Sequence, residues 1–204
     1  MKSKTVKAVE LGLLVGLIAA LMWSVGTVRT RQEISDKVVR LHVLANSDSE
    51  EDQALKYRVR DAVLGRLTAL MRTSEDRSQA EGIIRGQLLE LEELARREIA
   101  AAGYDYPVTA QLQELDFPTR EYESFTLPAG EYLALQLVIG EGAGQNWWCV
   151  VFPPLCTAAA AEVPASALAA GFSEEEVRFI TEEEGYVLKF KALEWLEALK
   201  EKLA

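Results

Sequence analysis

Both cysteines of the chain and two of its four tryptophans lie within one short string, NWWCVVFPPLC, at residues 146–156. A cysteine thiolate with a histidine in reach is the arrangement of a thiol hydrolase, and His42 is the single histidine. Cys149 would be the nucleophile and His42 its base, with Asn46 or Asp48 orienting the base. However, the neighbours of Cys149 are apolar, and no cationic side chain or helix N-terminus adjoins it to stabilise a thiolate. We therefore predict no catalytic residues and keep a Cys-His hydrolase as the competing interpretation.

The two cysteines offer a second chemistry, a local disulfide. Seven residues of extended chain would hold Cys149 and Cys156 about 23 Å apart, whereas bridged Cα atoms lie within about 7 Å. The chain must therefore reverse between them, and a turn near Phe152 to Pro154 would allow the bridge. A disulfide and a pair of reduced thiols in the core both stay open.

Neither a metal nor a phosphate ligand is predicted. His42, Asp48 and Glu50 have no recognisable ligand spacing. The GEGAG string at residues 140–144 is similar to phosphate-binding loops, which need a helix N-terminus directly after them. Here a strand pattern follows, so we interpret the string as a turn and predict no cofactor.

The apolar string also suits contact with another protein. In a strand, Trp147 and Trp148 point to opposite faces, and both faces here are apolar. Such a strand either lies between two layers of the protein or offers one face to a partner. Candidate partner-binding residues are Trp147, Trp148, Phe152, Pro153 and Pro154, with Asn46 and Asp48 as a second contact. The competing interpretations are two core tryptophans and a turn at residues 46–52 that only caps a helix.

The first half of the chain predicts a strand and two long helices. The β-branched and aliphatic string VVRLHVLA, from Val38 to Ala45, predicts a strand. A helix follows with two candidate N-caps, Ser47 with Glu50 or Ser49 with Asp52. A second helix with a 3.6-residue apolar stripe ends before Gly103.

The second half predicts strands at VTAQLQ, EYLALQLVIG and NWWCVVF. Leu115 and Phe117 break the alternation of the first strand, which predicts a bulge or its end there. The other two strands are expected to form a hairpin. The fold class is therefore α+β, with an N-terminal strand, two long helices packed on a mostly antiparallel sheet, and a C-terminal amphipathic helix at residues 188–203.

The N-terminus indicates export. Three lysines precede eighteen uncharged residues from Leu11 to Val28, the layout of a signal peptide or a short transmembrane segment. We expect residues 1–28 to be that segment and residues 29–204 to form one exported domain. Within it, residues 157–172 are expected to be a flexible linker and residues 173–204 a C-terminal helical part. The formal net charge of −10 argues against nucleic acid as a partner.

Two long strings carry a family resemblance. RLHVLANSDSEEDQALKYRVRDAVL at residues 40–64 and GEGAGQNWWCVVFPPLC at residues 140–156 resemble stage II sporulation protein R of endospore-forming bacteria. The likeness runs from about Val38 to Cys156, with a hydrophobic N-terminal segment before it. The matching residues are Arg40, His42, Asn46, Ser47, Asp48, Asp52, Arg60, Asp61, Trp147, Trp148, Cys149, Pro153, Pro154 and Cys156.

The resemblance implies a signalling ligand without catalytic residues of its own. Such a protein is made in the forespore and delivered to the space between the forespore and mother-cell membranes. There it activates a membrane-embedded aspartic protease, which removes the pro-sequence of a sporulation sigma factor. The implied partners are that protease and, through the N-terminal segment, the membrane. Competing with this interpretation are the extracytoplasmic Cys-His hydrolase and a passive envelope-binding module.

Overall fold

The fold is built on a four-stranded sheet with the strand order β2-β5-β1-β6. The structure is a computed structural model that describes residues 12, 14, 16, 28–157 and 162–181. Its elements are β1 (Val39–Leu44), α2 (Glu50–Met71), α3 (Arg77–Ala101), β2 (Val108–Phe117), β3 (Arg120–Glu121), β4 (Thr126–Leu127), β5 (Gly130–Ile139), β6 (Asn146–Phe152), α4 (Val163–Ala169) and α5 (Glu174–Thr181). A helical stretch at residues 28–35 precedes β1.

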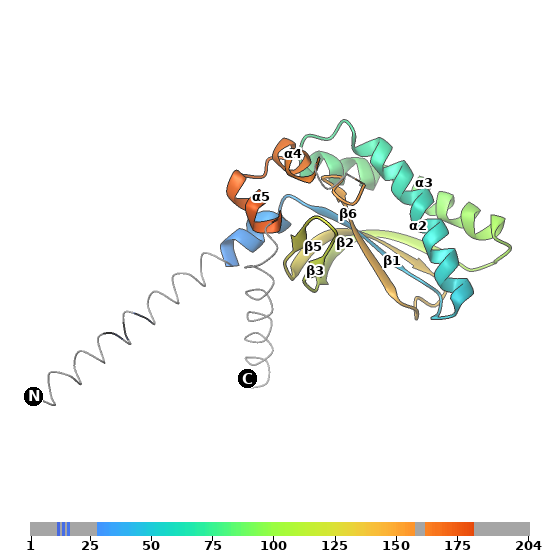
Figure 1. Cartoon of the computed structure of the whole chain (residues 1–204). Coiled ribbons are helices and arrows are strands. Elements are labelled where there is room, and N and C mark those ends of the chain that lie inside the picture. The colour runs from blue at the N-terminus through green and yellow to red at the C-terminus, as the bar shows by residue number, and fades with distance from the viewer. Residues whose placement is uncertain (1–11, 13, 15, 17–27, 158–161, 182–204) are drawn as a thin grey trace, which may run out of the picture.

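The layers match the predicted α+β class. Helices α2 and α3 lie side by side over one face of the sheet, and the β3-β4 hairpin lies beyond the other face (Figure 1). In the described part of the chain, no helix is long and apolar enough to cross a bilayer. The predicted export segment at residues 1–28 falls almost wholly outside that part, as does the predicted helix at residues 188–203.

The predicted hairpin between β5 and β6 is wrong, because β1 lies between these two strands. β1 pairs parallel with β5 and antiparallel with β6, and β5 pairs antiparallel with β2. The reason is the apolar composition of β1, which is largely buried on both faces. An edge position would expose part of this apolar surface, whereas a central position covers it. Two of the three pairings are antiparallel, as expected.

For the first strand of the second half, the predicted alternatives near Leu115 and Phe117 were a bulge and the end of the strand; the bulge is wrong, and the strand ends at Phe117. β2 keeps one continuous register against β5 from Val108 to Phe117. The buried side chains switch from one face of β2 to the other along the strand, because each end of it packs in a different core. Val108 and Leu112 belong to the core under the helices, whereas Phe117 belongs to a second core. An apolar residue on the second face therefore needs no irregularity in the strand.

The helices begin where capping side chains allow it. Ser49 is the N-cap of α2 and accepts a hydrogen bond from the backbone N–H of Asp52, so the second of the two candidate caps is used. Asp76 caps α3 in the same way through the N–H of Gln79. Gly103, at φ 87°, follows the end of α3, as predicted.

A second core covers one end of the opposite sheet face. Phe117, Tyr132, Val150 and Leu155 pack there with residues from the stretch before β1, from the β3-β4 hairpin and from the C-terminal helices. One of these helices, α4, lies inside the segment 157–172 that was expected to be a linker, and its Val163 and Ala167 are buried. Alanine is the strongest helix former, so a small-residue composition suits a helix as well as a linker.

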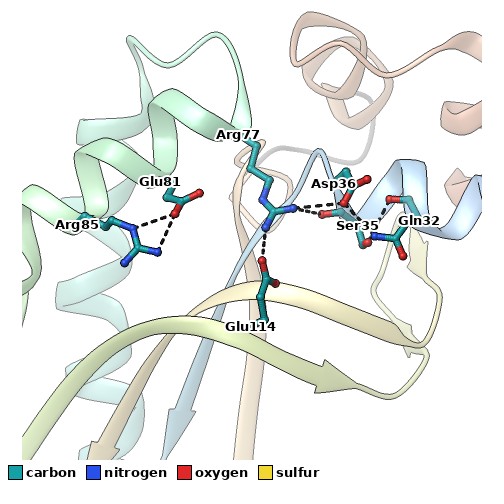
Figure 2. Close-up of polar contacts among 7 residues, drawn as sticks. All are labelled: Gln32, Ser35, Asp36, Arg77, Glu81, Arg85 and Glu114. Atoms are coloured by element: carbon teal, nitrogen blue, oxygen red, sulfur yellow. Dashed lines mark hydrogen bonds and ion pairs between the residues drawn. The ribbon is translucent and has the colours of Figure 1, made fainter.

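Arg77 fixes the approach to β1. Its guanidinium donates to the Glu114 carboxylate on β2 at 2.5 Å and to the Ser35 carbonyl at 3.4 Å, and lies 3.6 Å from Asp36 (Figure 2). One side chain at the start of α3 thus joins the helical layer, an edge strand and the segment before β1.

Helix α5 is held by an ion pair. Lys37 Nζ lies 2.6 Å from the Glu176 carboxylate, whose side chain is 5% exposed. Burial opposes ionisation of Glu176, but hydrogen bonds from Lys37 and Ser173 outweigh it and leave the pKa of Glu176 below its ordinary value. The pair therefore anchors α5 next to the start of β1.

We expect Glu176→Gln to lower the free energy of unfolding by about 1–3 kcal/mol at neutral pH, because Lys37 loses its anionic partner. A carboxyl group with a lowered folded pKa stabilises above its unfolded pKa and stops doing so as the pH falls through the folded pKa. The difference between wild type and Glu176→Gln in urea titrations should therefore shrink below about pH 4.5. Glu175→Gln, in the exposed first turn of α5, is the control, and an equal loss there would contradict the assignment.

Candidate partner-binding site

The two predicted tryptophans lie on β6, at the edge of the sheet. Trp147 is opposite Val43 and Trp148 is opposite His42, so the two indoles project from opposite faces. Both are half-buried. Trp147 packs against the core under the helices, with the Arg60 guanidinium 4.8 Å from its ring centroid.

Trp148 is held between two cation-capable groups on the other face. Its ring stacks on His42 with centroids 5.7 Å apart and an interplanar angle of 20°. The Arg120 guanidinium lies 3.6 Å from its ring centroid. Phe152 and Pro153, two further candidates, are buried, and only Pro154 of the proline pair is half-buried.

The cysteines form a disulfide. Cys149 and Cys156 are bonded, with Cα atoms 6.0 Å apart. The reversal at Pro153 and Pro154 brings them together, and the backbone N–H of Val150 points to the Cys156 sulfur at 3.0 Å. The bridge therefore folds residues 153–156 back over part of the outer side of β6.

His42 and Cys149 do not meet. Leu41, the residue before His42, is the register partner of Cys149, so the two side chains of interest lie on opposite faces of the sheet. His42 Nε2 donates to Asn146 Oδ1 at 2.7 Å, and its Nδ1 accepts from Gln136 at 3.2 Å. Burial lowers the pKa of His42 below its ordinary value, against the opposing effect of the Asn146 hydrogen bond. A Cys-His hydrolase needs a free thiol with a base in reach. Cys149 is in the disulfide, and His42 lies on the opposite face of the sheet.

The turn after β1 is an internal network centred on Asp52. Asn46 and Ser47 both donate to Asp52 Oδ2, at 2.8 Å and 2.6 Å. The hydrogen bond from Ser47 holds the pKa of Asp52 below its ordinary value, burial works in the opposite direction, and Asn46 and Tyr106 add to the lowering. The carboxylate therefore organises the turn as well as the first turn of α2.

The loop at residues 140–145 docks onto this turn. The N–H of Glu141 donates to Asn46 Oδ1 at 3.0 Å, and the N–H of Gln145 donates to Asp48 Oδ1 at 2.7 Å. The buried Lys56 donates to the carbonyl of Gln145 at 2.9 Å. Asn46 and Asp48, predicted as a second partner contact, thus use these oxygens inside the molecule.

The glycines of the loop are needed for this approach. A Cβ on Gly140, which has φ 58°, would lie 2.1 Å from Asn46 Oδ1, and one on Gly144 would lie 2.2 Å from the Ser47 carbonyl oxygen. The GEGAG string is therefore neither a two-strand hairpin turn nor a phosphate loop. It brings the two strings that carry the family resemblance into contact.

A cleft opens beside the tryptophans. It has a volume of about 230 Å³ and is lined by Tyr122, Glu123, Ser124, Phe125, Trp147, Trp148, Leu155 and Cys156. No local pattern predicts that residues 122–125 lie beside β6. The one available signal was the aromatic composition of the irregular segment between the strands.

In the described residues, no group of three or more His, Cys, Asp and Glu side chains is placed to hold a metal ion.

Comparison with known families shows which family the chain belongs to. The sequence pattern of the family described as Stage II sporulation protein R matches residues 35–162, which include β1, the Asp52 turn, the glycine loop and the disulfide. The chain belongs to the stage II sporulation protein R family. It is accordingly a sporulation protein, as its resemblance to that family implied.

A curated relative supports the assignment. The chain is 40% identical over 123 residues to Stage II sporulation protein R of Bacillus subtilis (strain 168), a match that covers 60% of this chain and 55% of the relative. The match thus spans little more than half the length of that relative. No solved structure matches the chain.

The docking of the glycine loop can be tested with a pair of glycine substitutions. Gly140→Ala should destabilise the protein by about 1–3 kcal/mol, since alanine is strained at positive φ and its Cβ would displace Asn46. Gly82→Ala, inside α3 with no atom near the new Cβ, should stabilise it by about 0.5–1 kcal/mol. Urea denaturation measures both, and equal shifts would contradict the close contact at Gly140.

The disulfide predicts a thiol count and a redox effect. The purified protein, kept unreduced, should contain no free thiol, and reduction should lower its free energy of unfolding by about 2–3 kcal/mol because the short closed loop is opened. A double variant, Cys149→Ala with Cys156→Ala, should not respond to the reductant. Two titratable thiols in the native, unreduced protein would refute the bridge.

Proposed function

We propose that this protein is an exported sporulation signal that activates a membrane-embedded aspartic protease by binding to it. The protease then cleaves the precursor of a sigma factor in the mother cell. Residues 1–28 direct the chain out of the forespore or anchor it there, in the space between the two membranes. The protein contributes contact and no covalent chemistry.

The observation that carries the proposal is the aromatic cleft beside β6, within the region that matches the family. The residues that suit catalysis are engaged structurally: Cys149 in the disulfide, and His42 between Gln136 and Asn146. What stays accessible is a half-buried aromatic surface, which is the composition of an interface centre. A disulfide is also the cross-link of oxidising compartments, which supports a site of action outside the cytoplasm.

Activation by binding has a defined energetic requirement. A ligand shifts a protease toward its active state only by binding that state more tightly. A change from almost wholly inactive to almost wholly active requires about 5 kcal/mol of differential affinity. Two tryptophans in the centre of an interface are of the residue type that supplies such energies.

Co-expression in a non-sporulating host tests the proposal. We expect cleavage of the sigma-factor precursor only when the exported chain and the protease are both present, as followed by immunoblot. A version without residues 1–28, retained in the cytosol, is the control and should give no cleavage. Equal cleavage without the chain would favour a passive envelope-binding module, and equal cleavage with the cytosolic version would refute an external site of action.

A further inference from the structure

The described residues cover the outer side of β6 only in part. β6 pairs with β1, and no described strand pairs with its other side. The N–H of Val150 points outward to the Cys156 sulfur, so the disulfide covers the edge at that residue. Alternation along an antiparallel strand then places the backbone N–H and C=O groups of Trp148 and Asn146 on the same outer side. There they meet no backbone partner among the described residues.

The cleft lies on this open edge. Trp147 and Trp148 project from opposite faces of the sheet, yet both line the cleft, so it must open at the side of the strand and not over one face. Tyr122 and Phe125, whose rings stack with centroids 4.5 Å apart, also line it. Its volume of about 230 Å³ is below the range of about 300–1,000 Å³ that is usual for small-molecule sites. It is large enough for one or two side chains of a peptide.

Two guanidinium groups lie near the cleft, those of Arg120 and Arg40. The Arg120 guanidinium lies over Trp148, and no described carboxylate forms an ion pair with it. Glu123 lines the cleft without pairing with Arg120. Arg40 is fully buried, donates from Nη2 to the Tyr122 hydroxyl at 2.7 Å and packs over the Phe117 and Tyr132 rings, so it is closed to a ligand.

This charge distribution selects the occupant. The chain carries a formal net charge of −10, yet the half-buried Arg120 guanidinium beside the cleft forms no ion pair with a carboxylate among the described residues. An uncompensated cation at a desolvated site favours an anionic ligand group. The complementary ligand is therefore an acidic one.

We infer that the edge of β6 is a strand-addition site for an extended, acidic segment of the partner protein. The segment pairs its backbone with Trp148 and Asn146, places an apolar side chain in the cleft, and brings a carboxylate to Arg120. The inference rests on the proposed function, under which the segment belongs to the extracytoplasmic part of the membrane-embedded protease.

Two substitutions of Asn146 distinguish strand addition from a contact made by side chains alone. Asn146→Pro removes the outward N–H, and proline is tolerated at the first residue of an edge strand. Asn146→Ala keeps that N–H while losing the same side chain, which includes the hydrogen bond to His42. In the co-expression assay with the full chain, we expect Asn146→Pro to reduce precursor cleavage about tenfold relative to Asn146→Ala. Equal cleavage by the two variants would overturn strand addition.

Position 120 tests the charge of the occupant. Arg120→Glu should reduce cleavage about tenfold and Arg120→Gln by less, whereas Arg97→Glu, on the exposed surface of α3, should stay within about twofold of wild type. Circular dichroism of the purified chains checks folding, and the neutral variant serves if charge reversal prevents it. Wild-type cleavage by both Arg120 variants would overturn an acidic occupant.

A photo-cross-linker identifies the occupant directly. Placed at Glu123, it should capture the protease, and placed at Leu89, which is 84% exposed on α3, it should not. Capture of a second copy of this chain at Glu123 would overturn the commitment to a foreign partner. Failure of the wild-type chain to promote cleavage would overturn the proposed function together with this inference. Cleavage that all cleft variants preserve would overturn the inference alone.

Discussion

The position of β1 between β5 and β6 is the constraint on which the rest of the structure depends. Since β1 separates two strands that follow each other in sequence, the connection at residues 140–145 must cross the end of β1. It can do so only by passing against the Asn46–Ser47 turn, at a distance that leaves no room for a Cβ at Gly140 or Gly144. The same insertion displaces β6 to the edge of the sheet, with its tryptophans beside an open cleft.

Arg40 shows what this arrangement costs on the second face. A fully buried guanidinium with one hydrogen bond is unfavourable unless its surroundings compensate. The compensation is aromatic: the guanidinium carbon lies 3.9 Å from the ring centroid of Phe117 and 4.9 Å from that of Tyr132. The hydroxyl that it contacts belongs to Tyr122, which also lines the cleft. Stability of the second core and the electrostatics of the cleft are thus coupled through one tyrosine.

Local patterns in the sequence predicted the elements well, and their pairing poorly. The first strand, both long helices and the strand residues of β5 and β6 follow from periodicity and capping, which are local properties. The place of β1 in the sheet does not, because adjacent strands in a sequence favour a hairpin and only burial on both faces of β1 argues otherwise. Composition predicts the tryptophans as contact candidates, whereas it could not predict that Tyr122 and Phe125 lie beside them, since their proximity to β6 is a long-range contact. Asn46 and Asp48 stay predicted contacts, and the sequence could not show that their side-chain oxygens accept hydrogen bonds from the glycine loop, because that contact is long-range.

The uneven protection of β6 is the feature that best relates this fold to binding. An exposed strand edge is an aggregation hazard that proteins usually block along its whole length. Here the disulfide and the adjoining prolines cover the C-terminal half, where Val150 meets Cys156, whereas no described strand pairs with the half that carries Trp148. The disulfide therefore blocks strand pairing at one half of this edge and not at the other. A strand edge that is closed beside an aromatic cleft, but not across it, is suited to admit one extended segment in one register.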